Sequence, residues 1–267
     1  MMPKTPTRFA RPRWLAAICC SVLAASPWLG ACEKQIDYGT EFTHALPSET
    51  QQVWAVAPAL NLSGQPGVDP LLQADILFAE LQTVRGLRAI PVNRVAQVYA
   101  ALGINQIESA ETASRVCDML GCDALIVPTV TLYDPYDPPK MGAAIQVFVR
   151  NGVSLTPGEV FDANLVQNWQ RSGRDPGVMA MQEETSGGAF LQEAAMFDAS
   201  HGTTRRSALY YADGRSDPHG AAASDEIFIS MDRYSGFVYH ELLGDVMHAI
   251  QEQNRYLAEQ RRAMARN

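Results

Sequence analysis

Two histidines near the C-terminus are residues that could bind a metal ion. His240 opens the stretch HELLGDVMH, which begins like the helix of a zinc protease, and His248 ends it. The His-Glu-x-x-His pattern of those enzymes would need its second histidine at position 244, which is Gly244 here. Because a zinc site uses at least three protein ligands, this pair would need a further ligand from another segment. We therefore expect both histidines to be solvated or in the core, and no metal to be bound.

Asp198, Ser200 and His201 in the stretch FDASH have the residue types of a catalytic triad. Triads are normally assembled from distant segments, so this spacing favours a turn at a strand end whose polar side chains bond the backbone. The chain has no Gly-x-Ser-x-Gly elbow, and LSGQPG at 62–67 lacks the Lys-Ser/Thr of a phosphate-binding loop. The sequence therefore predicts no catalytic residue, no cofactor and no enzyme activity.

Cys32 lies in a context in which a thiol accepts lipid. The stretch LGAC, residues Leu29, Gly30, Ala31 and Cys32, resembles a bacterial lipobox. Its leucine lies three positions before the cysteine, and the two small residues let a peptidase reach the backbone. We predict cleavage before Cys32 and attachment of diacylglyceryl and palmitate-type acyl chains to that residue.

The segment before Cys32 has the composition of a secretory signal. The first thirteen residues hold four bases and no acid, and the apolar run 14–29 is shorter than the ~20 residues of a spanning helix. An ordinary signal peptide with a chance cysteine, or an uncleaved anchor, are the alternatives. Two or three acyl chains hold a protein durably on a bilayer, so the lipid bilayer is the first predicted partner.

The charge of the chain argues against nucleic acid as a partner. The formal net charge is −8, and it falls to −12 without residues 1–31, which carry four bases and no acid. An acidic domain is repelled by nucleic acid and by anionic headgroups.

Cys117 and Cys122 are the cysteines left after Cys32 and the signal segment. Cys117 falls on the apolar face of an expected helix, and Cys122 follows Gly121, which should end that helix. Outside the cytoplasm such a pair can form a disulfide, and two buried thiols are the alternative.

The turn YDPYDPPK is the best candidate for partner recognition in the sequence. Its prolines fix the backbone, and Tyr133 and Tyr136 offer large contact areas between Asp134 and Asp137. The alternative is a stiff, solvated hairpin. Two carboxylates are too few for a convincing calcium loop.

These residues need a scaffold, and hydrophobic periodicity predicts an α/β fold. We expect a mixed sheet of about five strands with helices packed on it. The expected strands are 53–58, 87–92, 123–133, 143–149 and 190–199. Helices are expected from Asp69-Pro70, up to Gly103, after Ser109, in 203–215, and from about Ser230 to the end region, with a buried face of Tyr239, Leu242, Leu243, Val246 and Ile250.

The chain divides into five predicted regions. Residues 1–31 are the signal peptide, 32–51 a flexible tether and 52–150 the core α/β domain. Residues 151–188 form a long irregular insert, because their Pro and Gly content shows no period. Residues 189–267 complete the domain and supply the C-terminal helix.

Four stretches resemble the curli-secretion (CsgG-like) lipoproteins and the TolB amino-terminal domain. These are VWAVAPALNLSG, FAELQTVRGLRAIPVNRVAQVYAALG, ASRVCDMLGCDALIVPTVTLYD and MFDASHGTTRR. The resemblance implies a compact α/β interaction domain of periplasmic lipoproteins, without catalytic residues. The chain departs from it at Pro128, where a glycine is usual, and it lacks amphipathic hairpins for a pore.

The expected protein is thus anchored to a bacterial cell membrane or outer membrane, faces the periplasm, and binds another envelope protein. Its role would be that of an accessory factor in envelope assembly, secretion or activation of wall enzymes, and it could form homo-oligomers. A cell-wall hydrolase or metal enzyme, or an oligomeric secretion-pore subunit, are the alternatives.

Overall fold

The computed structural model describes residues 44–48, 50–150, 190–213, 215 and 225–265. Contacts divide the chain into residues 1–40 and 41–267, and every described residue falls in the second unit. Within the described ranges, none of the helices combines the length and the apolar character that crossing a bilayer requires. The predicted insert 151–188 lies outside the described residues.

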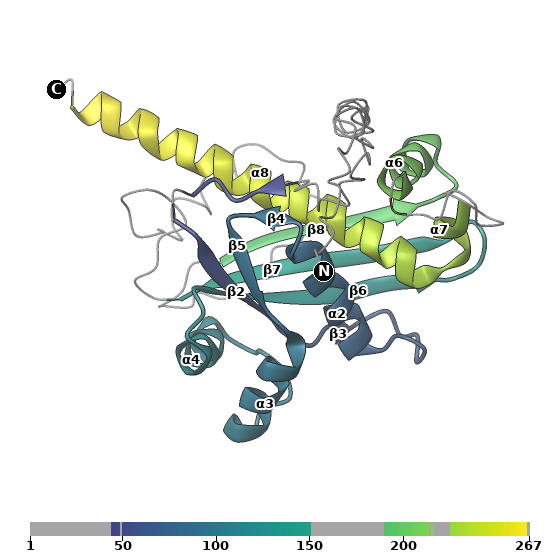
Figure 1. Cartoon of the computed structure of the whole chain (residues 1–267), viewed down its shortest axis with the longest axis horizontal. Helices are drawn as coiled ribbons and strands as arrows, with labels where there is room; N and C mark the ends of the chain where they lie inside the picture. Colours follow the sequence, from purple (N-terminus) through teal and green to yellow (C-terminus); the bar gives the residue numbers. More distant parts are fainter. Residues whose placement is uncertain (1–43, 49, 151–189, 214, 216–224, 266–267) are drawn as a thin grey trace, which may run out of the picture. The chain divides into compact units, whose positions relative to one another are not determined.

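Six strands form one mixed sheet in the order β5-β2-β6-β7-β8, with β3 also paired to β6 (Figure 1). Their bounds are β2 Gln52–Val56, β3 Leu60–Asn61, β5 Leu87–Ile90, β6 Ala124–Asp134, β7 Lys140–Val149 and β8 Phe190–Asp198. β2 is parallel to β5 and β6, whereas β7 is antiparallel to both β6 and β8. The predicted α/β class and mixed sheet are confirmed.

β6 lies in the middle of the sheet even though it contains a proline. It pairs with β2 through 124–126 and with β3 through 129–130. Pro128 lies between these two parallel pairings. Neither pairing needs a hydrogen bond from residue 128, so the missing N–H of proline is tolerated there.

The helix boundaries follow from local capping chemistry. The Oδ1 atom of Asp69 accepts a hydrogen bond from the Leu71 N–H at 2.9 Å, and Pro70 begins α2 (Pro70–Leu81). Two further helices are α3 (Val92–Leu102) and α4 (Ala110–Leu120). They end at Gly103 and Gly121, each with φ of +67°, a left-handed conformation that glycine adopts without a Cβ penalty.

Helices cover both faces of the sheet, because successive side chains of a strand point to opposite faces and both sets are apolar. Trp54 and Val56 of β2 join a large core with α2 and α8 (Met231–Met264), whereas Ala55 and Ala57 join a smaller core with α3 and α4. The predicted buried face of the last helix is confirmed, since all five of its residues are fully buried. From Arg255 onward the described side chains of α8 are exposed.

Two shorter helices lie near the start of α8, namely α6 (Gly202–Ala212) and α7 (Glu226–Ile229). They join β8 to α8 and pack beside it (Figure 1). α6 contributes Tyr211 to the large core, and α7 contributes Phe228.

The N-terminal end of the described chain is packed rather than extended. Sequence composition predicts a flexible tether through residue 51, whereas residues 44–48 lie against the body. β1 (His44–Ala45) pairs in parallel with β4 (Val84–Arg85), and Leu46 is only 5% exposed. The prediction failed here because the contacts are with residues far along the chain, such as Asn254, whose Nδ2 donates to the Pro47 carbonyl at 2.9 Å.

Candidate functional site

The predicted lipid attachment residue and cleavage motif, Leu29 to Cys32, lie outside the described residues. They remain predictions from sequence.

The predicted recognition turn connects β6 to β7, and the structure separates its two tyrosines. Tyr133 packs against the large core, and burial raises the pKa of its hydroxyl. Tyr136 is 80% exposed at the tip of the hairpin. Asp134 stabilises the tip, because its Oδ1 accepts a hydrogen bond from the Tyr136 N–H at 3.3 Å, and the Asp137–Pro138 peptide is cis. Tyr136 is therefore the more exposed of the two tyrosines, and Tyr133 is partly buried.

Exposed apolar side chains lie next to this turn, in a row across the strands. Leu132 of β6 is opposite Gly142 of β7, which is opposite Met196 of β8. Leu62 continues β3 beside them, because its N–H donates to the Val130 carbonyl at 2.8 Å. Leu132 is 37% exposed, whereas Leu62 and Met196 are 69% and 67% exposed. We call Leu62, Leu132, Tyr136 and Met196 the hairpin-end surface.

Gly142 shapes the middle of this row. The register of β6 shifts between Val130 and Leu132, so Thr131 forms a bulge. A Cβ on Gly142 would lie 2.6 Å from the Thr131 Oγ1 atom and 3.1 Å from the Leu132 Cβ atom. The bulge therefore requires glycine opposite it, and it turns Leu132 outward. The signal in the sequence was the glycine within the expected hairpin.

Cys117 and Cys122 are both buried, and both are free thiols in this structure. Their sulfur atoms are 2.7 Å apart, and the Cys122 N–H donates to the Cys117 carbonyl at 3.0 Å. The hydrogen bond from Cys122 and burial raise the pKa of Cys117, so its thiol is protonated at neutral pH. The disulfide stays a prediction.

The two histidines of the zinc-like stretch lie in different environments. His248 is exposed, and its Nε2 atom is 3.6 Å from Glu252. His240 is mostly buried, with Nδ1 3.5 Å from the Oε2 atom of Glu80. Among the described residues, no group of three or more His, Cys, Asp or Glu side chains has a metal-binding arrangement.

Asp198 ends β8 in the hydrogen-bonded turn that its sequence context predicts. Its Oδ1 accepts from the Ser200 N–H at 2.8 Å, and its Oδ2 lies 3.1 Å from the Lys140 Nζ atom. The hydrogen bonds from Ser200, together with Lys140, lower the pKa of Asp198 to about 2. The His201 Nδ1 atom is 3.8 Å from Oδ2, and the His201 side chain is largely exposed.

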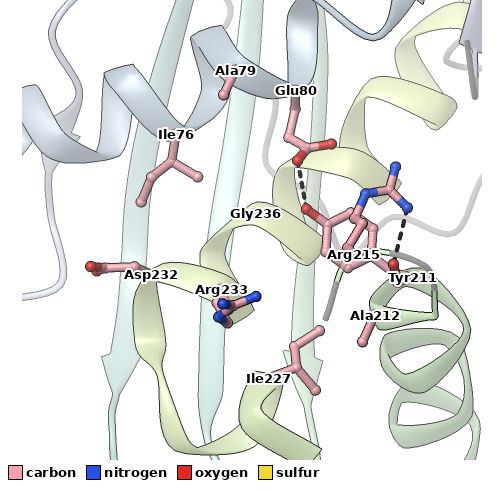
Figure 2. Close-up of a pocket in the computed structure, with 10 residues that line it drawn as sticks. All are labelled: Ile76, Ala79, Glu80, Tyr211, Ala212, Arg215, Ile227, Asp232, Arg233 and Gly236. Atoms are coloured by element: carbon pink, nitrogen blue, oxygen red, sulfur yellow. Dashed lines mark hydrogen bonds between the residues drawn. The ribbon is translucent and has the colours of Figure 1, made fainter. Parts of the chain in front are cut away.

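A pocket of about 200 Å³ between α2, α6, α7 and α8 contains buried polar residues that the sequence did not reveal (Figure 2). Tyr211 points from α6 toward α2, and its hydroxyl donates to the Glu80 Oε1 atom at 2.5 Å. The Arg215 guanidinium stacks 4.3 Å from the centre of the Tyr211 ring and donates to the Tyr211 carbonyl. Burial raises the pKa of Tyr211 far above its ordinary value, so its hydroxyl stays a proton donor.

The charges around this pocket nearly cancel. Glu80 and Asp232 line it, as do Arg215 and Arg233, and Arg233 is paired with Glu226 at 3.1 Å. We therefore interpret these charged residues as contacts that hold the helices together. Their balanced charges do not favour the binding of an anion or a cation. Glu80 was missed because a charged residue beside Leu77 and Leu81 resembles the solvated edge of a helix. Its partner Tyr211 lies 131 positions away.

No protein-family model matches the chain, and neither does any curated protein. The chain is similar to several solved structures, all at low identity. One is the LpoB C-terminal domain from Salmonella enterica, 11% identical, with 41% of this chain and 76% of that chain covered and a TM-score of 0.31. Another is lipoprotein GNA1162 from Neisseria meningitidis, 17% identical, with 45% and 92% covered and a TM-score of 0.31.

A third is the hypothetical protein CT253 from Chlamydia trachomatis, 10% identical, with 75% of this chain and 98% of that chain covered and a TM-score of 0.37. At these values the similarities carry no statement about the function of this chain. The resemblance to the curli-secretion and TolB proteins stays a prediction from sequence.

Proposed function

We propose that this protein is a lipid-anchored accessory factor of the bacterial envelope that binds another envelope protein through the hairpin-end surface. Acyl chains on Cys32 hold it on the membrane, and it acts by binding and not by catalysis. The proposal for the anchor is supported by the LGAC stretch, its basic flank and its short apolar segment.

The observation that carries the binding proposal is the row of Leu62, Leu132 and Met196 on neighbouring strands, with Tyr136 at its end. Side chains of this kind gain free energy when a partner covers them, at roughly 25 cal/mol for each Å² of apolar surface removed from water. Tyrosine and methionine are also enriched at protein interfaces. The β6–β7 hairpin is paired with β8 along β7, so little conformational entropy is lost when a partner binds.

Photo-crosslinking in intact cells tests this proposal. A photoreactive amino acid replaces Tyr136 in one variant and Tyr210 in the other. Tyr210 is a matched control, because it is 85% exposed but lies on α6. We expect one discrete crosslinked envelope protein from position 136 and none from position 210.

A second pair of variants tests the apolar row itself. Met196→Glu places a charge in the row, whereas Met119→Glu places one on α4, where the side chain is 53% exposed. We expect Met196→Glu to abolish the crosslink from position 136 with an unchanged melting temperature, and Met119→Glu to leave it intact. Equal crosslinking in both variants would mean that the row does not bind the partner.

A further inference from the structure

Residues 44–48 are held on the folded body at three points, and we call them the N-terminal strap. His44 packs on α8 and belongs to the short β1–β4 pair. The Leu46 N–H donates to the Arg85 carbonyl at 2.9 Å, and Pro47 accepts the hydrogen bond from Asn254. None of these contacts joins the large sheet, so the strap can detach without breaking that sheet.

The helix α8 has a space that fits the imidazole of His44. A Cβ on Gly244 would lie 2.9 Å from the Cε1 atom of His44, so the ring occupies volume that any larger residue would fill. The His44 Nε2 atom lies 3.1 Å from the His240 carbonyl oxygen, and the two rings are 4.5 Å apart. Because a carbonyl only accepts, Nε2 carries the proton in this contact.

The charges around His44 leave its imidazolium poorly compensated. On α8 the neighbour is His240, with Glu241 and Asp245 near it on the same helix, and Arg85 belongs to β4, which pairs with β1. Glu80 of α2 faces the cluster with Tyr211 of α6, and Arg215 follows α6. The Oε2 atom of Glu80 lies 3.5 Å from the Nδ1 atom of His240, so this carboxylate contacts His240. A second proton on His44 would place a cation in this partly buried contact, with its ring centre 4.5 Å from that of His240.

We propose that the N-terminal strap is a pH-dependent latch, docked on α8 while His44 is neutral and detached when His44 is protonated. Burial, followed by the proximity of His240, lowers the pKa of docked His44 from its ordinary value of 6.5. The docked state then binds fewer protons than the detached state. Docking is therefore at full strength well above pH 6.5 and weakens as the pH falls below that value.

Detachment would lengthen the link between the membrane and the body, a consequence that rests on the proposed lipid anchor. With the strap docked, the contacts with the body begin at His44, and with the strap released they begin at Gln52 of β2. The eight added residues contribute at most about 29 Å of reach. Acid would thus let the body reach farther from the bilayer.

Hydrogen exchange on the detergent-extracted full chain tests the latch, and it does so whether or not Cys32 is acylated. The reporter is the Leu46 amide, and the internal reference is the Gln52 amide, which donates to the Gly86 carbonyl. After correction for the chemical exchange rate, we expect Leu46 to exchange roughly tenfold faster at pH 5.0 than at pH 7.5. Gln52 should stay protected.

Three variants make the test specific. His44→Gln keeps an N–H donor but cannot be protonated, so the pH dependence at Leu46 should vanish. His248→Gln, at an exposed histidine on the same helix, should leave it unchanged. Gly244→Ala should make Leu46 exchange fast at both pH values, because it fills the space of the His44 ring. Wild-type Leu46 equally protected at both pH values, or pH dependence retained in His44→Gln, would overturn the proposal.

Discussion

The hydroxyl of Tyr211 and the carboxylate of Glu80 form a 2.5 Å hydrogen bond that joins α6 to α2. Both residues are buried, Tyr211 with 9% and Glu80 with 8% of its surface exposed. Hydrogen bonds to charged groups contribute about 1.5–3 kcal/mol when they are shielded from water. This bond therefore helps to hold the first half of the chain to the second.

Replacing Tyr211 by Phe should lower the free energy of unfolding by roughly 1.5–3 kcal/mol, because it leaves the Oε1 atom of Glu80 without its donor. Tyr210→Phe is the matched control, since its ring is exposed, and it should change stability by less than about 0.5 kcal/mol. Urea denaturation followed by circular dichroism measures both. Equal midpoints for the two variants would contradict the role of the bond.

Gly236 of α8 leaves room for the same hydroxyl. A Cβ there would lie 2.8 Å from the Tyr211 Oη atom. Although alanine favours helices by about 1 kcal/mol over glycine, we expect Gly236→Ala to destabilise the protein by roughly 1–2 kcal/mol through this clash. In the Tyr211→Phe background the clash is removed, so Gly236→Ala should become neutral or stabilising. A double-mutant cycle by urea denaturation measures the coupling free energy between Tyr211→Phe and Gly236→Ala. Additive effects of the two substitutions would contradict the predicted clash.

The Asp198 turn predicts a dependence of stability on pH. The pKa of Asp198 is lowered to about 2, so its charged form stabilises the folded state above its ordinary value of 3.8. That contribution is lost as the pH falls through about 2. Asp198→Asn should therefore have a lower melting temperature than wild type at pH 7. The difference between the two melting temperatures should become smaller between pH 4 and pH 2. Asp75→Asn, at an exposed position on α2, should have the same melting temperature as wild type.

The buried cysteine pair should become a disulfide in an oxidising compartment, because its sulfur atoms are already in contact. Oxidation of the two thiols by an added disulfide or by the cellular oxidation machinery would remove two hydrogens from the chain. We expect protein extracted under denaturing conditions with an alkylating reagent to show neither cysteine modified. Alkylation of both Cys117 and Cys122 would show that they stay thiols in the cell.

The fold could be predicted well from sequence wherever one local interaction decides the structure. Asp69, Ser109 and Gly103 define helix ends through bonds or dihedral angles within a few residues. The nearly continuous apolar run of β6 predicts a strand at the centre of the sheet. Features that depend on a contact between residues far apart in the sequence were not predicted. His44 needs Gly244, Tyr211 needs Glu80, and Gly142 needs the bulge at Thr131, and no periodic pattern encodes such pairs.

The candidate site shows the same division. The turn with Tyr133 and Tyr136 was found because prolines and tyrosines next to each other are a local signal. Tyr133 packs against the core because it lies opposite Met141, on the face of the sheet covered by α8. Only the strand pairing reveals this position. Leu62 and Met196 join the surface through strand pairing across 134 positions, which a single sequence does not specify.

Metabolic labelling with radioactive palmitate, followed by membrane fractionation, tests the central claim most directly. The wild-type protein should carry the label and fractionate with membranes. Cys32→Ala should lose the label, because no thiol remains at the predicted attachment position to accept the diacylglyceryl group. Label retained on the Cys32→Ala variant, together with its continued presence in the membrane fraction, would contradict the account.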